Sequence, residues 1–73
     1  MKTLMQVPVG TSAIVKKLNV EGNLKRRLMD MGITKGVEIL VQQEAPFGDP
    51  LELRLRGFAL ALRKSDAACI VVE

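Results

Sequence analysis

A chain of 73 residues has room for one small domain, and its 48% hydrophobic content supports a folded core and argues against disorder. The 11 basic and 8 acidic residues leave a net charge of +3, which suits an acidic partner but is weak evidence for nucleic-acid binding. The apolar runs are all shorter than the roughly 18 residues of a membrane span, and the N-terminus does not resemble a signal peptide. We therefore expect a single soluble, cytoplasmic domain over residues 1–73.

The inventory of reactive side chains argues against catalysis. The sequence has no histidine and a single cysteine, Cys69, so it offers no Cys–His or Ser–His pair and few ligands for a transition metal. We expect no enzymatic activity and no cofactor. Glu44, Asp49 and Glu52 flank one loop and could form an oxygen-only metal site, although solvated loop charges are the simpler interpretation. Cys69 lies among apolar residues, which predicts a buried, unreactive thiol.

The N-terminal part predicts a lead-in and a strand. Residues 1–10 combine apolar residues with a proline and a glycine, a pattern typical of a short segment with one helical turn. Residues 11–18 follow as the first strand. Lys16 and Lys17, near the end of this strand, favour an exposed or edge position in the sheet.

A short helix is predicted over residues 24–31. Asn23 is a suitable N-cap, and Gly32 is suitably placed just beyond the C-terminus of the helix. Three apolar residues lie at i, i+4 and i+7 and form one stripe: Leu24, Leu28 and Met31. A helix of about two turns is marginal in isolation, so we expect this stripe to dock against the sheet.

A hairpin forms the centre of the sequence. Residues 51–56 alternate strictly between leucine and a charged residue, which predicts a strand with one buried face, and residues 37–42 alternate less cleanly. Residues 45–50 contain two prolines, a glycine and an aspartate, and predict the connecting loop. Gly57 marks a tight bend before a third strand over residues 58–63. This strand is apolar on both faces, so we expect both faces to be covered.

The C-terminal part completes a small sheet. Residues 64–69 predict a turn with one helical turn capped by Ser65, and residues 70–72 predict a β-branched final strand. The predicted fold is therefore mainly β: a small, partly open antiparallel barrel of about five strands, with one short helix between the first two strands. A two-layer α+β sandwich is the alternative.

Two basic clusters are candidates for partner binding, because neither has a matching run of acids nearby in the sequence. They comprise Lys25, Arg26 and Arg27 on the helix, and Arg54 and Arg56 on the outward face of a strand. Plain solvated charge is the alternative for both. RNA-binding barrels usually stack bases on aromatic side chains, and this chain offers only Phe47 and Phe58. We therefore do not expect nucleic-acid binding.

Three motifs resemble those of a known family. Residues 45–51 read A-P-F-G-D-P-L, residues 60–67 read L-A-L-R-K-S-D-A, and residues 27–36 read R-L-M-D-M-G-I-T-K-G. Together and in this order they resemble the FeoA family of ferrous-iron transport proteins. The resemblance implies an SH3-like barrel and a role in bacterial ferrous-iron uptake. It also implies a cytoplasmic protein that acts on FeoB, the membrane GTPase that carries Fe²⁺.

The resemblance also sets expectations for individual residues. It supplies no catalytic residue, and the turn residues Gly32, Gly36, Gly48, Asp49 and Pro50 are interpreted as positions that form the fold. We expect a FeoB-type partner that brings the chain to the inner membrane, no tight Fe²⁺ binding by the chain alone, and self-association through exposed strand edges. The alternative function is a basic β-barrel that binds RNA or another macromolecule unrelated to iron.

Overall fold

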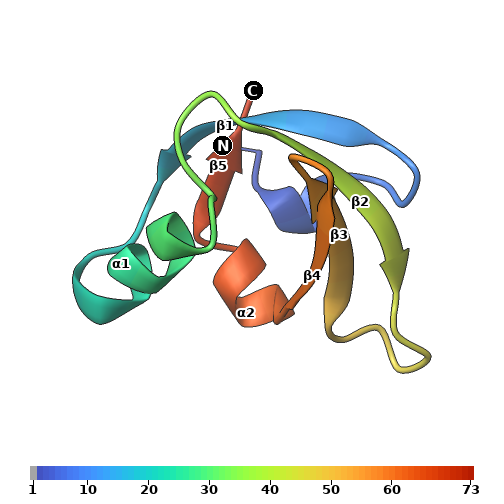
Figure 1. Cartoon of the computed structure of the whole chain (residues 1–73). Helices are drawn as coiled ribbons and strands as arrows, with labels where there is room; N and C mark the ends of the chain where they lie inside the picture. The colour runs from blue at the N-terminus through green and yellow to red at the C-terminus, as the bar shows by residue number, and fades with distance from the viewer. Residues whose placement is uncertain (1) are drawn as a thin grey trace.

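The computed structural model describes residues 2–73, and within them the chain forms five strands, two α-helices and one 3-10 turn (Figure 1). In chain order these are η1 (Leu4–Gln6), β1 (Ser12–Leu18), α1 (Gly22–Asp30), β2 (Glu38–Glu44), β3 (Leu51–Leu55), β4 (Phe58–Leu62), α2 (Lys64–Ala67) and β5 (Ile70–Val72). The predicted helical turn in the N-terminal segment and the predicted helix between the first two strands are both confirmed.

The strands form one antiparallel sheet in the order β4-β3-β2-β1-β5. β4 and β5 are therefore its edge strands, and the sheet curls so that α2, which connects them in sequence, lies in the opening between them (Figure 1). This is the predicted partly open antiparallel barrel, and the sandwich is not observed. Of the two alternatives predicted from Lys16 and Lys17, the exposed position is confirmed, since both residues are exposed. The edge position is not, because β5 returns to pair with β1.

The core confirms the alternation read from the hairpin. Leu51, Leu53 and Leu55 are at most 3% exposed, while the intervening charged residues face outward or are half-buried. The buried side chains of β2 and β1 complete this inner face. On α1, Leu28 is fully buried, and Leu24 and Met31 pack against the core while partly exposed. The helical stripe therefore docks as predicted, with Leu28 as its anchor.

The two ends of α1 differ in how well they were predicted. Gly32 ends the helix as expected: its φ is +95°, and its N–H donates to the Met29 carbonyl at 2.9 Å. The predicted cap at Asn23 is wrong, because Glu21 is the N-cap residue and Asn23 lies inside the first turn. The left-handed φ of +74° at Gly22 turns the chain from the extended Glu21 directly into the helix, two residues early.

The prediction that the third strand is covered on both faces is also wrong. Phe58 is 46% exposed, Ala59 and Ala61 are exposed, and only Leu62 is fully buried. The reason is topological: β4 is an edge strand that pairs with β3 alone, so its outer face meets solvent. The apolar composition of the strand predicted that its side chains would be buried, but a strand at the edge of the sheet has no neighbour to cover them.

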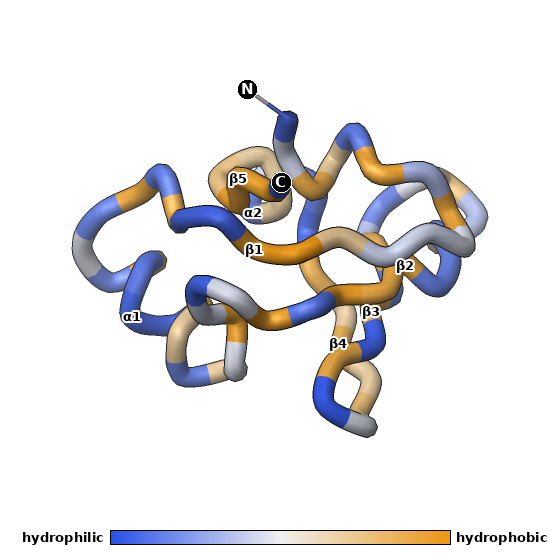
Figure 2. The backbone as a smooth tube through the Cα atoms, turned by 90° about the horizontal axis from the view of Figure 1, so that it is seen from above, coloured by the Kyte–Doolittle hydropathy of each residue, from blue (hydrophilic) through white to orange (hydrophobic). Residues whose placement is uncertain are grey.

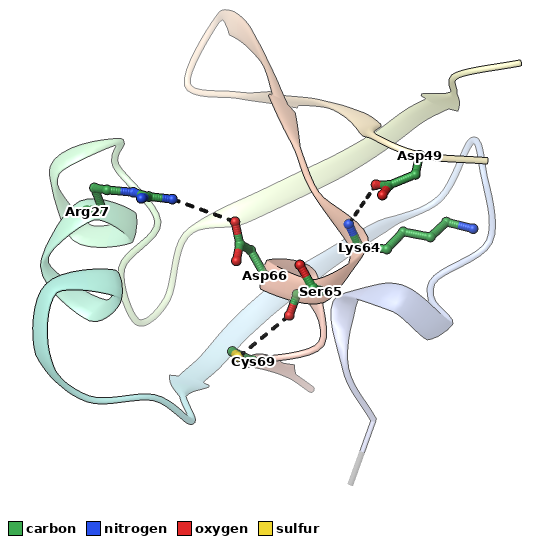
Figure 3. A network of polar contacts seen from close by, with 6 residues as sticks. All are labelled: Arg27, Asp49, Lys64, Ser65, Asp66 and Cys69. Carbon is green, nitrogen blue, oxygen red and sulfur yellow. Dashed lines mark hydrogen bonds and ion pairs between the residues drawn. The ribbon is translucent and has the colours of Figure 1, made fainter. Parts of the chain in front are cut away.

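Residues of the last connection also depart from expectation. Ser65 lies inside α2 and Arg63 is its N-cap residue, so Ser65 does not cap this helix. Cys69 is half-buried, not buried, and its thiol donates to the Ser65 carbonyl at 3.8 Å (Figure 3). The partial exposure of Cys69 follows from the place of α2 at the barrel opening, where one side of this short helix remains in contact with solvent.

Candidate partner-binding surface

The three consecutive basic residues of α1 point in different directions, because neighbouring residues of an α-helix lie about 100° apart around its axis. Lys25 is half-buried and turns toward β1, and Arg26 is exposed on the outer face of the helix. Arg27 reaches across to α2, where its guanidinium lies 3.8 Å from the Asp66 carboxylate (Figure 3). The compact basic cluster expected from the sequence is therefore divided, and one of its members has an acidic partner distant in the chain.

The second predicted cluster is also rearranged. Arg54 is exposed on β3, as expected for the outward face of a strand. Arg56 is not on that face, because it lies in the two-residue loop between β3 and β4. Both loop residues have positive φ, +50° at Arg56 and +85° at Gly57, as in the type I′ turns that suit tight hairpins. The tight bend predicted at Gly57 is confirmed, but the position of Arg56 was not foreseen.

The structure brings together a different set of cations. A surface hollow of about 410 Å³ lies between β1, α1 and the loop that precedes β2. It is lined by four lysines, Lys16, Lys17, Lys25 and Lys35, together with Leu18, Met29 and Thr34. We call this site the lysine hollow. Figure 2 shows that β1 is hydrophobic in its middle and becomes hydrophilic toward α1. Residues 16–18 of β1 line the hollow.

Local backbone features place these lysines. The pairing of β1 with β5 shifts register between Val15 and Lys17, and such a bulge sets two successive side chains on one side of a strand. Lys16 and Lys17 therefore both face the hollow, although neighbouring strand residues normally point to opposite faces. The opposite wall is tied to β1 by two backbone hydrogen bonds: Gly36 N–H donates to the Val15 carbonyl at 2.8 Å, and Val15 N–H donates to the Val37 carbonyl at 2.9 Å.

The four lysines of the hollow have no acidic partner at ion-pair distance within residues 2–73. The ion pairs found within residues 2–73 are Arg27–Asp66 at 3.8 Å and Lys64–Glu44 at 3.7 Å, so none of the four lysines is paired with an acid in that part of the chain. Sequence reasoning recognised Lys16 and Lys17 as basic but did not join them to Lys25 or Lys35. The sequence shows these lysines at three separate places, residues 16–17, 25 and 35, and only the tertiary structure brings them to one site.

The acidic residues of the central hairpin serve the fold. Asp49 accepts a hydrogen bond from the Lys64 N–H at 2.8 Å and so binds the first turn of α2 to the loop (Figure 3). Glu44 pairs with the Lys64 ammonium, whereas Glu52 accepts a hydrogen bond from the Gln43 amide. Between residues 2 and 73, no three acidic or cysteine side chains are grouped so that they could hold a metal ion.

These features define a class of protein before they define a family: a small, mainly β barrel of SH3-like type whose distinctive surface is charged and exposed. The FeoA domain model matches residues 2–73, and the chain belongs to the FeoA family. The helices found in residues 2–73 are all too short or too polar to cross a membrane.

One relative joins this domain to a transporter. The chain is 34% identical over 70 residues to the Fe(2+) transport protein A/Fe(2+) transporter FeoB fusion protein of Porphyromonas gingivalis (strain ATCC BAA-308 / W83). The match covers 96% of this chain but 8% of the fusion protein. The chain is therefore similar to one small segment of a much longer protein.

Solved structures confirm the fold. The solution structure of iron(II) transport protein A from Clostridium thermocellum is 38% identical with a TM-score of 0.93, and the match covers 99% of this chain and 44% of that chain. The crystal structure of Stenotrophomonas maltophilia FeoA complexed with zinc is 34% identical with a TM-score of 0.86, covering 100% and 91% of the two chains. That protein is described as a procaryotic SH3 domain protein and a suggested bacterial ferrous iron transport activating factor.

Proposed function

We propose that this chain is a cytoplasmic accessory protein of bacterial ferrous-iron uptake that acts by binding a FeoB-type transporter. The observation that carries the proposal is the Porphyromonas gingivalis protein, in which a segment similar to nearly the whole chain is fused to FeoB. Fusion keeps two modules at a high effective concentration, which is useful when the modules work in contact. We expect this chain to make the same kind of contact with a FeoB-type transporter.

The surface of the chain supports binding as its mode of action. Most of its basic side chains are exposed, and exposed charges mainly speed association with an oppositely charged partner. The absence of histidine from the sequence removes the most common general base. The chain therefore acts through protein–protein contact, and Fe²⁺ is the cargo of its partner and not its own ligand.

The test is direct binding to the cytoplasmic part of a FeoB-type transporter, measured by biolayer interferometry with the 73-residue chain in solution. We expect saturable binding whose association rate falls as salt rises, because salt screens exposed charges. Failure to saturate at concentrations up to about 1 mM, the weak end of specific association, would contradict the proposal. Unstructured RNA provides the second arm, and saturable binding of RNA alone would favour the alternative function.

Charge-reversal variants test the candidate residues. One variant carries Arg26→Glu and Arg27→Glu in the α1 cluster. The other carries Arg54→Glu and Arg56→Glu in the β3–β4 hairpin, and both variants change the net charge by the same amount. We expect the α1 variant to associate more slowly than the native chain, most visibly at low salt, with folding checked by circular dichroism. Lys25 is left unchanged in both variants, because it lines the lysine hollow.

A further inference from the structure

The lysine hollow places four positive charges around one site, and these lysines make no ion pair within residues 2–73 that would stabilise the fold. Lys16, Lys17 and Lys35 are exposed and Lys25 is half-buried, so the site is open to water. Like charges gathered around one hollow repel one another, and no acid within residues 2–73 is paired with them. An anionic ligand would relieve this repulsion, because its negative charge would interact favourably with lysines that the fold already holds around the hollow.

The lining indicates what kind of anion fits. The hollow has an apolar part as well as a charged rim: Met29 is 48% exposed and Leu18 is half-buried. Methionine adapts its shape to many apolar groups, so this floor suits a flexible aliphatic side chain. A ligand that carries carboxylates around one apolar group would satisfy both parts of the lining.

Other polyanions fit this lining less well. Proteins that bind single-stranded nucleic acid usually combine phosphate contacts from lysine and arginine with base stacking on aromatic rings, and no aromatic side chain is among the residues that line the hollow. A flat lipid surface meets convex parts of a protein, whereas this site is concave and two of its walls, β1 and the loop before β2, are joined by backbone hydrogen bonds. An acidic segment of polypeptide can enter such a hollow.

We propose that the lysine hollow binds an acidic segment of the partner protein, with two or more carboxylates against the lysines and one aliphatic side chain against Met29 and Leu18. The identity of the partner, a FeoB-type transporter, rests on the proposed function. The chemistry of the segment rests on the hollow alone. The two claims can therefore fail separately.

The experiment compares two matched pairs of substitutions. Lys16→Gln with Lys17→Gln removes two charges from the hollow, and Lys2→Gln with Arg63→Gln removes two exposed charges elsewhere. Lys25→Gln with Lys35→Gln removes the other two cations and serves if the first variant folds poorly. The probes are the cytoplasmic part of the transporter and a labelled peptide of alternating Glu-Glu-Leu, with a Gln-Gln-Leu peptide as its neutral control.

We expect each hollow variant to weaken both probes about tenfold and the Lys2/Arg63 variant to weaken them less than twofold. Amide shifts in the nuclear magnetic resonance spectrum should centre on residues 16–18, 25–29 and 34–35. Equal weakening by the hollow and control variants would overturn the inference, and so would equal binding of the neutral peptide.

The remaining outcomes separate the two claims. If the transporter binds all variants alike, the hollow is not its contact, the inference is overturned and the proposed function stands. If the transporter binds none of them while the acidic peptide binds at the lysines, the hollow takes an acidic segment and the proposed function is wrong. Binding at the hollow of vesicles of phosphatidylglycerol or of RNA, in place of the peptide, would also overturn the inference.

Discussion

The lysine hollow and the β3–β4 hairpin are both basic, but they are made in different ways. The hollow takes its four lysines from β1, α1 and the loop before β2, and it exists only when these segments are packed together. The hairpin takes Arg54 and Arg56 from three consecutive residues, and a two-residue loop sets their positions. Tertiary contacts build the first region, whereas local backbone geometry builds the second.

This difference shows why a cluster in sequence is a poor guide to a cluster in space. Lys25, Arg26 and Arg27 are adjacent in the chain, yet the helix sends Lys25 to the hollow and Arg27 to Asp66 on α2. Lys17 and Lys35 are 18 positions apart and line the same site. We therefore expect changes to tertiary anchors to have large effects and changes to local turns to have small ones.

The largest effect is expected from Leu28→Ala, which removes the fully buried anchor of α1. Loss of a buried leucine costs about 2–5 kcal/mol, a large part of the stability of so small a domain. Urea denaturation followed by circular dichroism measures the change. Met29→Ala, at a neighbouring position that is 48% exposed, is the control and should cost under about 1 kcal/mol. Equal stability of the Leu28 variant and the native chain would show that α1 does not depend on this contact.

An intermediate effect is expected from Asp49→Ala, which removes the hydrogen bond that the hairpin loop accepts from the Lys64 N–H at 2.8 Å. The side chain acts as a helix cap supplied from a distant loop, and loss of such a cap costs about 1 kcal/mol. Asp49→Asn retains an acceptor and should recover most of the stability in thermal denaturation. If the alanine and asparagine variants melt at the same temperature, this hydrogen bond does not hold α2 to the loop.

The smallest effect, and one of opposite sign, is expected from Arg56→Asn. Arg56 has φ +50°, a left-handed conformation that is costly for most residues and that asparagine tolerates well in a type I′ turn. We expect stabilisation by about 0.5 kcal/mol in urea denaturation. Arg54→Asn, in the adjoining strand, should instead destabilise because asparagine is unfavourable in strands. A loss of stability in the Arg56 variant would show that this arginine contributes more to the fold than its turn conformation costs.

Sequence reasoning worked best where the information was local. The alternation of leucines in residues 51–56 predicted the buried face of β3, and Gly32 and Gly57 marked the ends of two elements. Sequence reasoning failed where the burial of a side chain depends on which elements lie next to it in the fold. Phe58 begins an apolar strand, but that strand lies at the edge of the sheet and the side chain is 46% exposed.

The sequence by itself determined the class of fold, the main strands and helix, the turn residues and the family, because periodicity, turn chemistry and short motifs depend on residues a few positions apart. Only the tertiary structure decided which cations meet. The bulge at Val15 and Lys17, the packing of Leu28 and the backbone bonds of Gly36 bring distant lysines to one hollow. These are contacts between segments far apart in the chain, and their pairing depends on the register of the sheet, which periodicity alone does not encode.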